Sequence, residues 1–122
     1  MGYNANSSAS SSQASRLIYI CTMTLSKPVE LSIVVPLYNE EGNIDFLFQR
    51  LMSVLDSLER SYEIVCINDG SQDNTLSCLI KYHQTYPSIK IINLSRNFGK
   101  ETALTAGIDY ATGAAVIPID AD

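Results

Sequence analysis

The pattern of apolar residues from residue 31 onward constrains this chain more than any other feature. Four short, β-branched runs alternate with segments in which apolar residues recur every three or four positions, as in amphipathic helices. The order βαβαβαβ predicts an α/β fold, in which helices cover the faces of a parallel sheet. The predicted strands are 31–35, 62–67, 89–94 and 115–119, and the predicted helices start after Asn43, after Ser71 or Asp73, and at Lys100.

Right-handed crossover connections leave few strand orders for such a sheet, and the commonest is 3-2-1-4. Ligands of open α/β sheets bind at the carboxyl ends of the strands, beside the point where the order reverses. Polar clusters follow all four predicted strands: PLYNE from Pro36, NDGS from Asn68, SRNFGK from Ser95 and DAD from Asp120. We therefore expect a polar, phosphate-bearing ligand at this edge.

Other patterns exclude several kinds of ligand and site. The first turn lacks GxGxxG and no Walker A motif is present, which disfavours a dinucleotide oxidoreductase and a P-loop NTPase. Thirteen acidic against eight basic residues give a net charge of −5, which argues against a nucleic-acid partner. Three cysteines without paired spacing and a single histidine disfavour a disulfide framework and a zinc site. We expect His83 at the surface or at a boundary, and Cys66 in the core.

The pair Asp120 and Asp122 stands at the end of the fourth predicted strand. Magnesium binds one or two carboxylates together with phosphate oxygens, so two carboxylates one residue apart suit a cation shared with a diphosphate. An acidic pair can also be an ordinary solvated turn, but its position at a strand end favours the functional interpretation.

Four longer motifs include these polar clusters: VVPLYNEE from Val34, INDGSQDNT from Ile67, LSRNFGKE from Leu94 and IDAD from Ile119. Together they resemble family 2 glycosyltransferases, most closely the branch of dolichol-phosphate mannosyltransferases and bacterial undecaprenyl-phosphate glycosyltransferases. The resemblance spans about residues 31–122. It implies the nucleotide-binding, N-terminal half of a GT-A (Rossmann-like) fold.

The same resemblance implies roles for individual residues. Asp69 would accept a hydrogen bond from the donor base, Lys100 would meet the nucleotide's charge with Gly99 beside it, and Asp120 and Asp122 would hold Mg²⁺ or Mn²⁺. The implied nucleotide-sugar-binding residues are Pro36, Tyr38, Asn39, Glu40, Asp69, Gly70, Ser71, Arg96, Asn97, Lys100, Asp120 and Ala121.

The implied activity is the inverting, metal-assisted transfer of a sugar from a UDP- or GDP-sugar to a polyprenyl phosphate. Domains of this family continue past the DxD motif, so we expect these 122 residues to be an N-terminal fragment that is inactive alone. The full-length parent would act at the cytoplasmic face of the membrane, held there by its C-terminal part. A non-catalytic nucleotide-binding or interaction module remains the alternative.

The chain divides at about residue 28. Six of the first fifteen residues are serine and few are bulky, so we expect residues 1–28 to be disordered. Residues 29–122 would form the donor-binding part, with no membrane span. The apolar run near residue 17 is too short to cross a bilayer.

Overall fold

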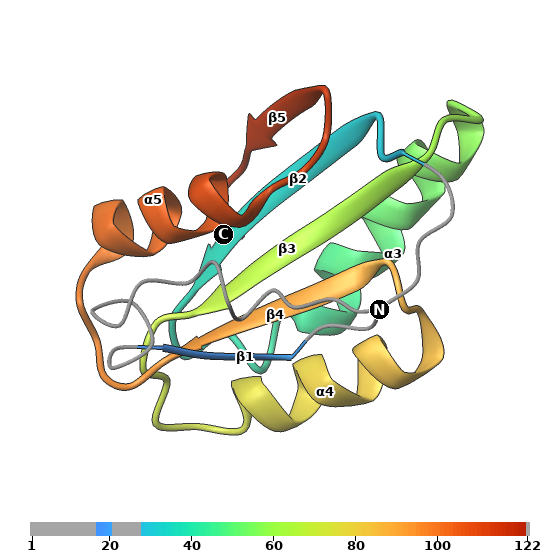
Figure 1. Cartoon of the computed structure of the whole chain (residues 1–122). Helices are drawn as coiled ribbons and strands as arrows, with labels where there is room; N and C mark the ends of the chain where they lie inside the picture. The colour runs from blue at the N-terminus through green and yellow to red at the C-terminus, as the bar shows by residue number, and fades with distance from the viewer. Residues whose placement is uncertain (1–16, 21–27, 122) are drawn as a thin grey trace.

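The computed structural model describes residues 17–20 and 28–121, which form a five-stranded sheet in the order β1-β4-β3-β2-β5 (Figure 1). Four strands run parallel, and β1 pairs antiparallel with β4 at one edge. Leaving β1 aside, the predicted α/β fold and the 3-2-1-4 order are confirmed. The strands are β1 (Leu17–Ile20), β2 (Leu31–Leu37), β3 (Tyr62–Asn68), β4 (Ile89–Leu94) and β5 (Ala115–Pro118).

Strand β1 corrects part of the predicted N-terminal disorder. Leu17 lies opposite Leu94 and Ile20 opposite Ile91, so these four residues extend the sheet at β4. Four apolar residues are too few for a periodic strand signal, and their pairing depends on the unpaired edge that β4 offers. The rest of the predicted segment before residue 28 lies outside the described residues.

Within residues 28–121, three helices cover the sheet, as the sequence predicts. Helices α3 (Ile44–Ser57) and α4 (Thr75–Thr85) pack on one face, and α5 (Lys100–Tyr110) packs on the other (Figure 1). None of the helices in the described part of the chain is long and apolar enough to cross a membrane.

Two helices, α3 and α5, start where the sequence predicts, and the start of α4 differs slightly. Asn43 is the N-cap of α3, as expected. The N-cap of α4 is Asn74 rather than Ser71 or Asp73. The carboxylate of Asp73 still accepts the backbone N–H of Thr75, at 2.9 Å, and so satisfies one donor of the first turn.

The central strands contribute side chains to a hydrophobic core on each face of the sheet. Val35 and Cys66 face α3 and α4, whereas Val34 and Val65 face α5 around Ala103. Because both faces are covered, the strands read as continuous apolar runs in the sequence. Cys66 is fully buried, as expected, and burial raises the pKa of its thiol, which makes it unreactive.

The imidazole of His83 is buried, contrary to the prediction of a surface or boundary position. Its Nδ1–H donates to the carbonyl oxygen of Ile89 at 2.6 Å. This contact joins the end of α4 to the start of β4, and helical spacing alone gives no sign of it.

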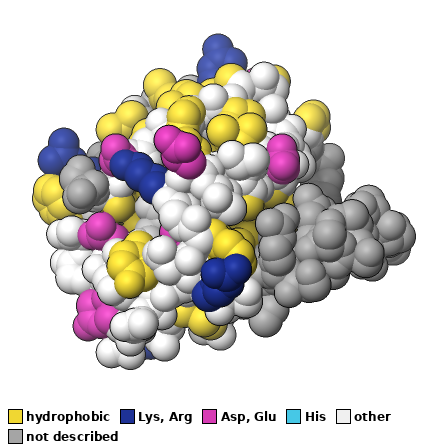
Figure 2. Space-filling view, turned by 90° about the vertical axis from the view of Figure 1, so that its left-hand side faces the viewer, with side chains coloured by type: hydrophobic (Ala, Val, Ile, Leu, Met, Phe, Trp, Pro, Cys, Tyr) yellow, Lys and Arg dark blue, Asp and Glu magenta, His cyan; other side chains and the backbone are white. Residues whose placement is uncertain are grey.

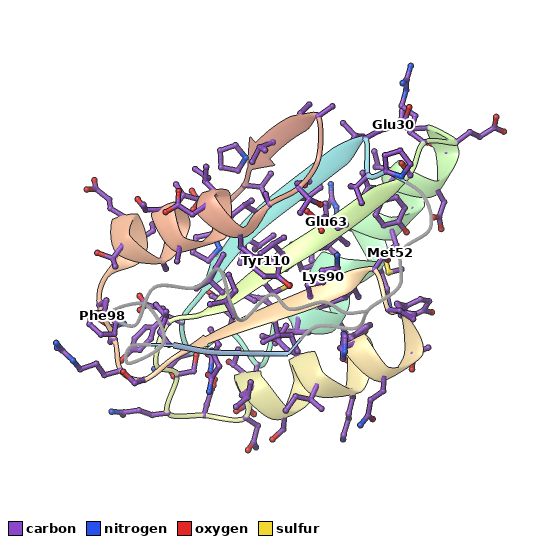
Figure 3. All side chains as sticks on the ribbon, viewed as in Figure 1. Glu30, Met52, Glu63, Lys90, Phe98 and Tyr110 are labelled. Atoms are coloured by element: carbon purple, nitrogen blue, oxygen red, sulfur yellow. The ribbon has the colours of Figure 1, made fainter. Side chains whose placement is uncertain are left out.

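A buried carboxylate, Glu63, fixes the connection between α5 and β5. It accepts hydrogen bonds from Ser32 Oγ (2.6 Å), the Thr112 N–H (2.8 Å) and Lys90 Nζ (2.9 Å). Figure 3 shows Glu63 and Lys90 close together, away from the end of the sheet where Phe98 lies.

The ionised form of Glu63 is favoured despite its burial. Desolvation raises the pKa of this carboxyl, but the hydrogen bonds from Ser32 and Thr112 and the charge of Lys90 outweigh it and lower the pKa below the ordinary value. The N–H of Gly113 also donates to Ser32 Oγ at 2.8 Å. The segment that leads into β5 is thereby held against β2.

Candidate functional site

Asp69, directly after β3, joins the loops that follow three strands. Its Oδ1 accepts the Phe98 N–H at 2.8 Å, and its Oδ2 accepts the Gly99 N–H at 3.1 Å and the Asn97 side-chain amide at 3.3 Å. Its own N–H donates to the carbonyl of Leu37 at 2.8 Å. Only 2% of the residue is exposed. This carboxylate therefore fixes the shape of the carboxyl edge of the sheet.

Gly70 allows the loops after β3 and β4 to touch. Its φ is +71°, a conformation that favours glycine. A Cβ added there would lie 2.3 Å from the backbone nitrogen of Asn97 and 2.4 Å from the carbonyl carbon of Arg96. These are backbone atoms that cannot turn aside, so the contact between the two loops depends on the missing side chain.

The loops after β2 and β3 are also tied together. The N–H of Asn39 donates to Ser71 Oγ at 2.8 Å, and Asn39 Oδ1 accepts the Gln72 N–H at 2.7 Å. The N–H of Glu40 donates to Thr75 Oγ1 at 2.9 Å. Asn39 has a φ of +53°, which asparagine tolerates better than most residues. Three loops are thus held in one arrangement before any ligand binds.

These loops surround a pocket of about 380 Å³ at the carboxyl edge, within the usual range for small-molecule sites. Figure 2 looks onto this side of the molecule and shows acidic, basic and apolar side chains together. Residues at or just after the carboxyl ends of all four parallel strands contribute to the lining, where ligands of open α/β sheets bind. They are Pro36, Leu37, Tyr38, Glu40, Asp69, Asn97, Gly99, Lys100, Asp120 and Ala121.

The structure brings most of the predicted binding residues into this lining. Those that lie outside it shape the surrounding loops: Asn39 and Ser71 bond to one another, Gly70 permits the loop contact, and Arg96 stacks on an aromatic ring. The guanidinium carbon of Arg96 is 4.3 Å from the centroid of the Phe98 ring.

Leu37 lines the pocket although the sequence does not single it out. It is a buried residue at the end of β2, and its backbone carbonyl accepts the N–H of Asp69. An apolar strand residue gives no chemical signal, so only its position in the sheet could have identified it.

The pocket carries an excess of negative charge. Among the described residues of its lining, Glu40, Asp69 and Asp120 are acidic and Lys100 is basic, which is a formal net charge of −2. Lys100 Nζ forms an ion pair with Asp120 Oδ1, and both side chains are more than half exposed. An anionic diphosphate entering this pocket would need a further cation to balance the charge.

A divalent cation fits the chemistry of this corner. Asp120 presents hard carboxylate oxygen, the ligand type of Mg²⁺ and Mn²⁺, and diphosphate oxygens would complete such a site. Asp122, the second predicted ligand, lies outside the described residues. Within the described ranges no group of three or more His, Cys, Asp or Glu side chains is arranged to hold a metal.

Comparison with known proteins gives a family match over residues 32–122, to the model described as glycosyl transferase family 2. An uncharacterized glycosyltransferase of Synechocystis sp. is 65% identical over 94 residues, which are 77% of this chain and 30% of that protein. A bactoprenol glucosyl transferase of Shigella phage SfX is 43% identical over 94 residues, 77% of this chain and 31% of that protein. The chain thus spans about 30% of the length of these relatives.

Solved structures share the fold. A mannosyltransferase from Pyrobaculum calidifontis, in complex with GDP-Man and Mn²⁺, matches with a TM-score of 0.66 and 25% identity over 79% of this chain and 30% of that one. TarS 1–349 of S. aureus, in complex with UDP-GlcNAc, matches with a TM-score of 0.65 and 25% identity over 77% and 27%. The sheet therefore corresponds to the N-terminal part of GT-A glycosyltransferases.

Proposed function

The chain belongs to glycosyl transferase family 2, and we propose that it forms the donor-binding part of an enzyme that transfers a sugar from a UDP- or GDP-sugar to a polyprenyl phosphate. The observation that carries the proposal is the preformed pocket at the carboxyl edge, to which loops after all four parallel strands contribute. The names of the relatives support both substrates: structures of similar fold hold UDP-GlcNAc or GDP-Man, and similar sequences act on bactoprenol.

Asp69 retains the capacity to recognise the donor base. An ionised carboxylate offers about four lone-pair directions. The loop contacts use two at Oδ2 and one at Oδ1, which leaves one direction on Oδ1. The ring N–H of uracil or guanine could donate to it, while Tyr38 and Glu40 would flank the base and ribose.

Lys100 and Asp120 would meet the diphosphate end of the donor. Asp120, with Asp122, would hold Mg²⁺ or Mn²⁺, which would neutralise charge on the leaving diphosphate. Lys100 would add a second positive charge from the start of α5. Gly99, at the same turn, lets the backbone come near the ligand without a side chain in the way.

The transfer itself is a single displacement in this proposal. A phosphate oxygen of the acceptor forms a bond to the anomeric carbon as the bond from that carbon to the diphosphate breaks, and the nucleoside diphosphate leaves. Attack from the opposite side inverts the anomeric configuration. Because the acceptor oxygen is already anionic, the reaction needs no protein base to remove a proton. The acceptor would be bound by regions that the longer relatives have beyond the segment matched here.

Calorimetric titration of the 122-residue chain with UDP, UDP-glucose and GDP-mannose, each with and without Mn²⁺, tests donor binding. We expect binding that Mn²⁺ strengthens, and a loss of that Mn²⁺-dependent gain in Asp120→Asn. Asp109→Asn is the matched control, because Asp109 is an exposed aspartate at the other end of α5. Binding that Mn²⁺ does not affect would instead favour a non-catalytic nucleotide-binding module, and no binding by a folded sample would contradict the donor site.

A further inference from the structure

Lys100 and Asp120 come from two different elements and form an ion pair in the lining of the pocket. Lys100 is the first residue of α5, and Asp120 follows β5. Their side chains are 61% and 55% exposed, so the pair can exchange partners without uncovering buried groups. In the described lining Lys100 carries the sole positive charge, opposite three carboxylates.

The position of Lys100 on its helix favours an anionic partner. Backbone dipoles place partial positive charge at a helix N-terminus, where a lysine is electrostatically unfavourable. The carboxylate of Asp120 offsets both positive charges in the ligand-free chain. A diphosphate would offset them equally well, and would then leave the Asp120 carboxylate available.

We infer that Lys100 and the divalent cation compete for the Asp120 carboxylate. When a nucleotide diphosphate binds, Lys100 forms its ion pair with the diphosphate oxygens instead, and the competition ends. The inference rests on the proposed function, because it requires the cation and the nucleotide to share this pocket. Lys100 then couples the two ligands: the nucleotide strengthens cation binding, and by thermodynamic reciprocity the cation strengthens nucleotide binding by the same factor.

The expected size follows from the exposure of the pair. Exposed ion pairs contribute little, so removal of Lys100 should strengthen Mn²⁺ binding in the absence of nucleotide by roughly twofold to fivefold. The same substitution should weaken the binding of UDP or GDP in the absence of metal. The factor by which nucleotide enhances Mn²⁺ binding should therefore be smaller in Lys100→Gln than in the wild type.

Titration of the full 122-residue chain with Mn²⁺, followed by the electron paramagnetic resonance signal of free Mn²⁺, measures these affinities directly. The titration is run alone and with saturating UDP or GDP for the wild type, Lys100→Gln and Lys100→Arg. Lys81→Gln is the matched control, because Lys81 is an exposed lysine on α4, outside the pocket lining. We expect Lys100→Arg and Lys81→Gln to retain the wild-type coupling and Lys100→Gln to lose part of it.

The possible results separate the inference from the proposed function. If Mn²⁺ and nucleotide bind to the wild type but Lys100→Gln has equal or weaker Mn²⁺ affinity without nucleotide, the competition is overturned and the donor site stands. If the folded wild type binds neither ligand, both are overturned.

A second measurement needs no variant. The rate at which an amine-reactive reagent labels Lys100, read by mass spectrometry relative to Lys81, should rise with Mn²⁺ alone and fall with nucleotide. A rate that Mn²⁺ leaves unchanged, in a sample that binds Mn²⁺, would also overturn the competition.

Discussion

The carboxylate of Asp69 and the backbone N–H of Phe98 lie 2.8 Å apart, although 29 positions separate the two residues in the chain. This bond joins the end of β3 to the loop that leads into α5. It places Gly99 and Lys100 beside the pocket, so a residue expected to contact the ligand also builds the site.

Substitution of Asp69 by asparagine should destabilise the fold. The amide has one oxygen where the carboxylate has two, so its NH₂ group must face the N–H of Phe98 or of Gly99. We expect the free energy of unfolding to fall by about 1–3 kcal/mol, the usual cost of an unsatisfied buried polar group. Urea denaturation followed by circular dichroism measures it, with Asp109→Asn as the control. Equal stability of Asp69→Asn and the wild type would mean that the loop contacts do not depend on the carboxylate.

Gly70→Ala should destabilise the chain by about 1–3 kcal/mol through a clash with the backbone of Arg96 and Asn97 and a strained φ. The added methyl should also push the two loops apart and weaken nucleotide binding. Gly42→Ala is the matched control, since a Cβ at Gly42 would meet nothing within 4 Å. Thermal unfolding and calorimetry check both effects. A Gly70→Ala protein as stable as Gly42→Ala would show that the loops can separate at no cost.

The buried Glu63 network should make stability depend on pH. Its pKa is lower in the folded chain than the ordinary value of 4.5, so ionised Glu63 stabilises the fold above that pH and the contribution is lost as pH falls through the folded pKa. We expect Glu63→Gln to lower the free energy of unfolding by about 1–3 kcal/mol at pH 7. The difference in the free energy of unfolding between Glu63→Gln and the wild type should become smaller below about pH 4.5.

Urea denaturation between pH 7 and pH 3.5 measures this narrowing. The exposed Glu59 provides the control, because Glu59→Gln should follow the wild-type curve. A gap that stays constant over the whole pH range would show that Glu63 acts by its shape and not by its charge.

Gly107→Ala should destabilise the chain even though alanine is the better helix former. A Cβ at Gly107 would lie 2.4 Å from Val34 Cγ1 and 2.5 Å from Ile67 Cδ1, between α5 and the sheet. We expect a loss of about 1–3 kcal/mol, typical of an overpacked core. Ile108→Ala, at an exposed position of the same helix, should change stability by less than about 0.5 kcal/mol. Thermal unfolding of both variants compares them, and a stabilised Gly107→Ala would mean that α5 can move away from the sheet without cost.

Much of the fold follows from the sequence because local patterns and sheet rules agree. β-branched runs and helical spacing locate β2 to β5 and the helices α3, α4 and α5, and the crossover rule leaves the observed strand order as the commonest choice. β1 could not be predicted in this way. The run Leu17–Ile20 is too short to show a periodic pattern, and it becomes a strand by pairing with the edge of β4. The burial of His83 likewise depends on a carbonyl six residues away.

Local sequence patterns predict which loops meet at the carboxyl edge, because parallel strands all end on the same side and each is followed by a polar loop. The role of each residue there depends on contacts that form only in the folded chain. Asp69 accepts a hydrogen bond from the loop after β4, and Gly70 leaves room for the backbone of Asn97. Lys100 forms an ion pair with Asp120. Propensity and periodicity depend only on residues that are close together in the sequence. These contacts join loops that are 20 or more positions apart, and they form only when the sheet brings the strand ends together.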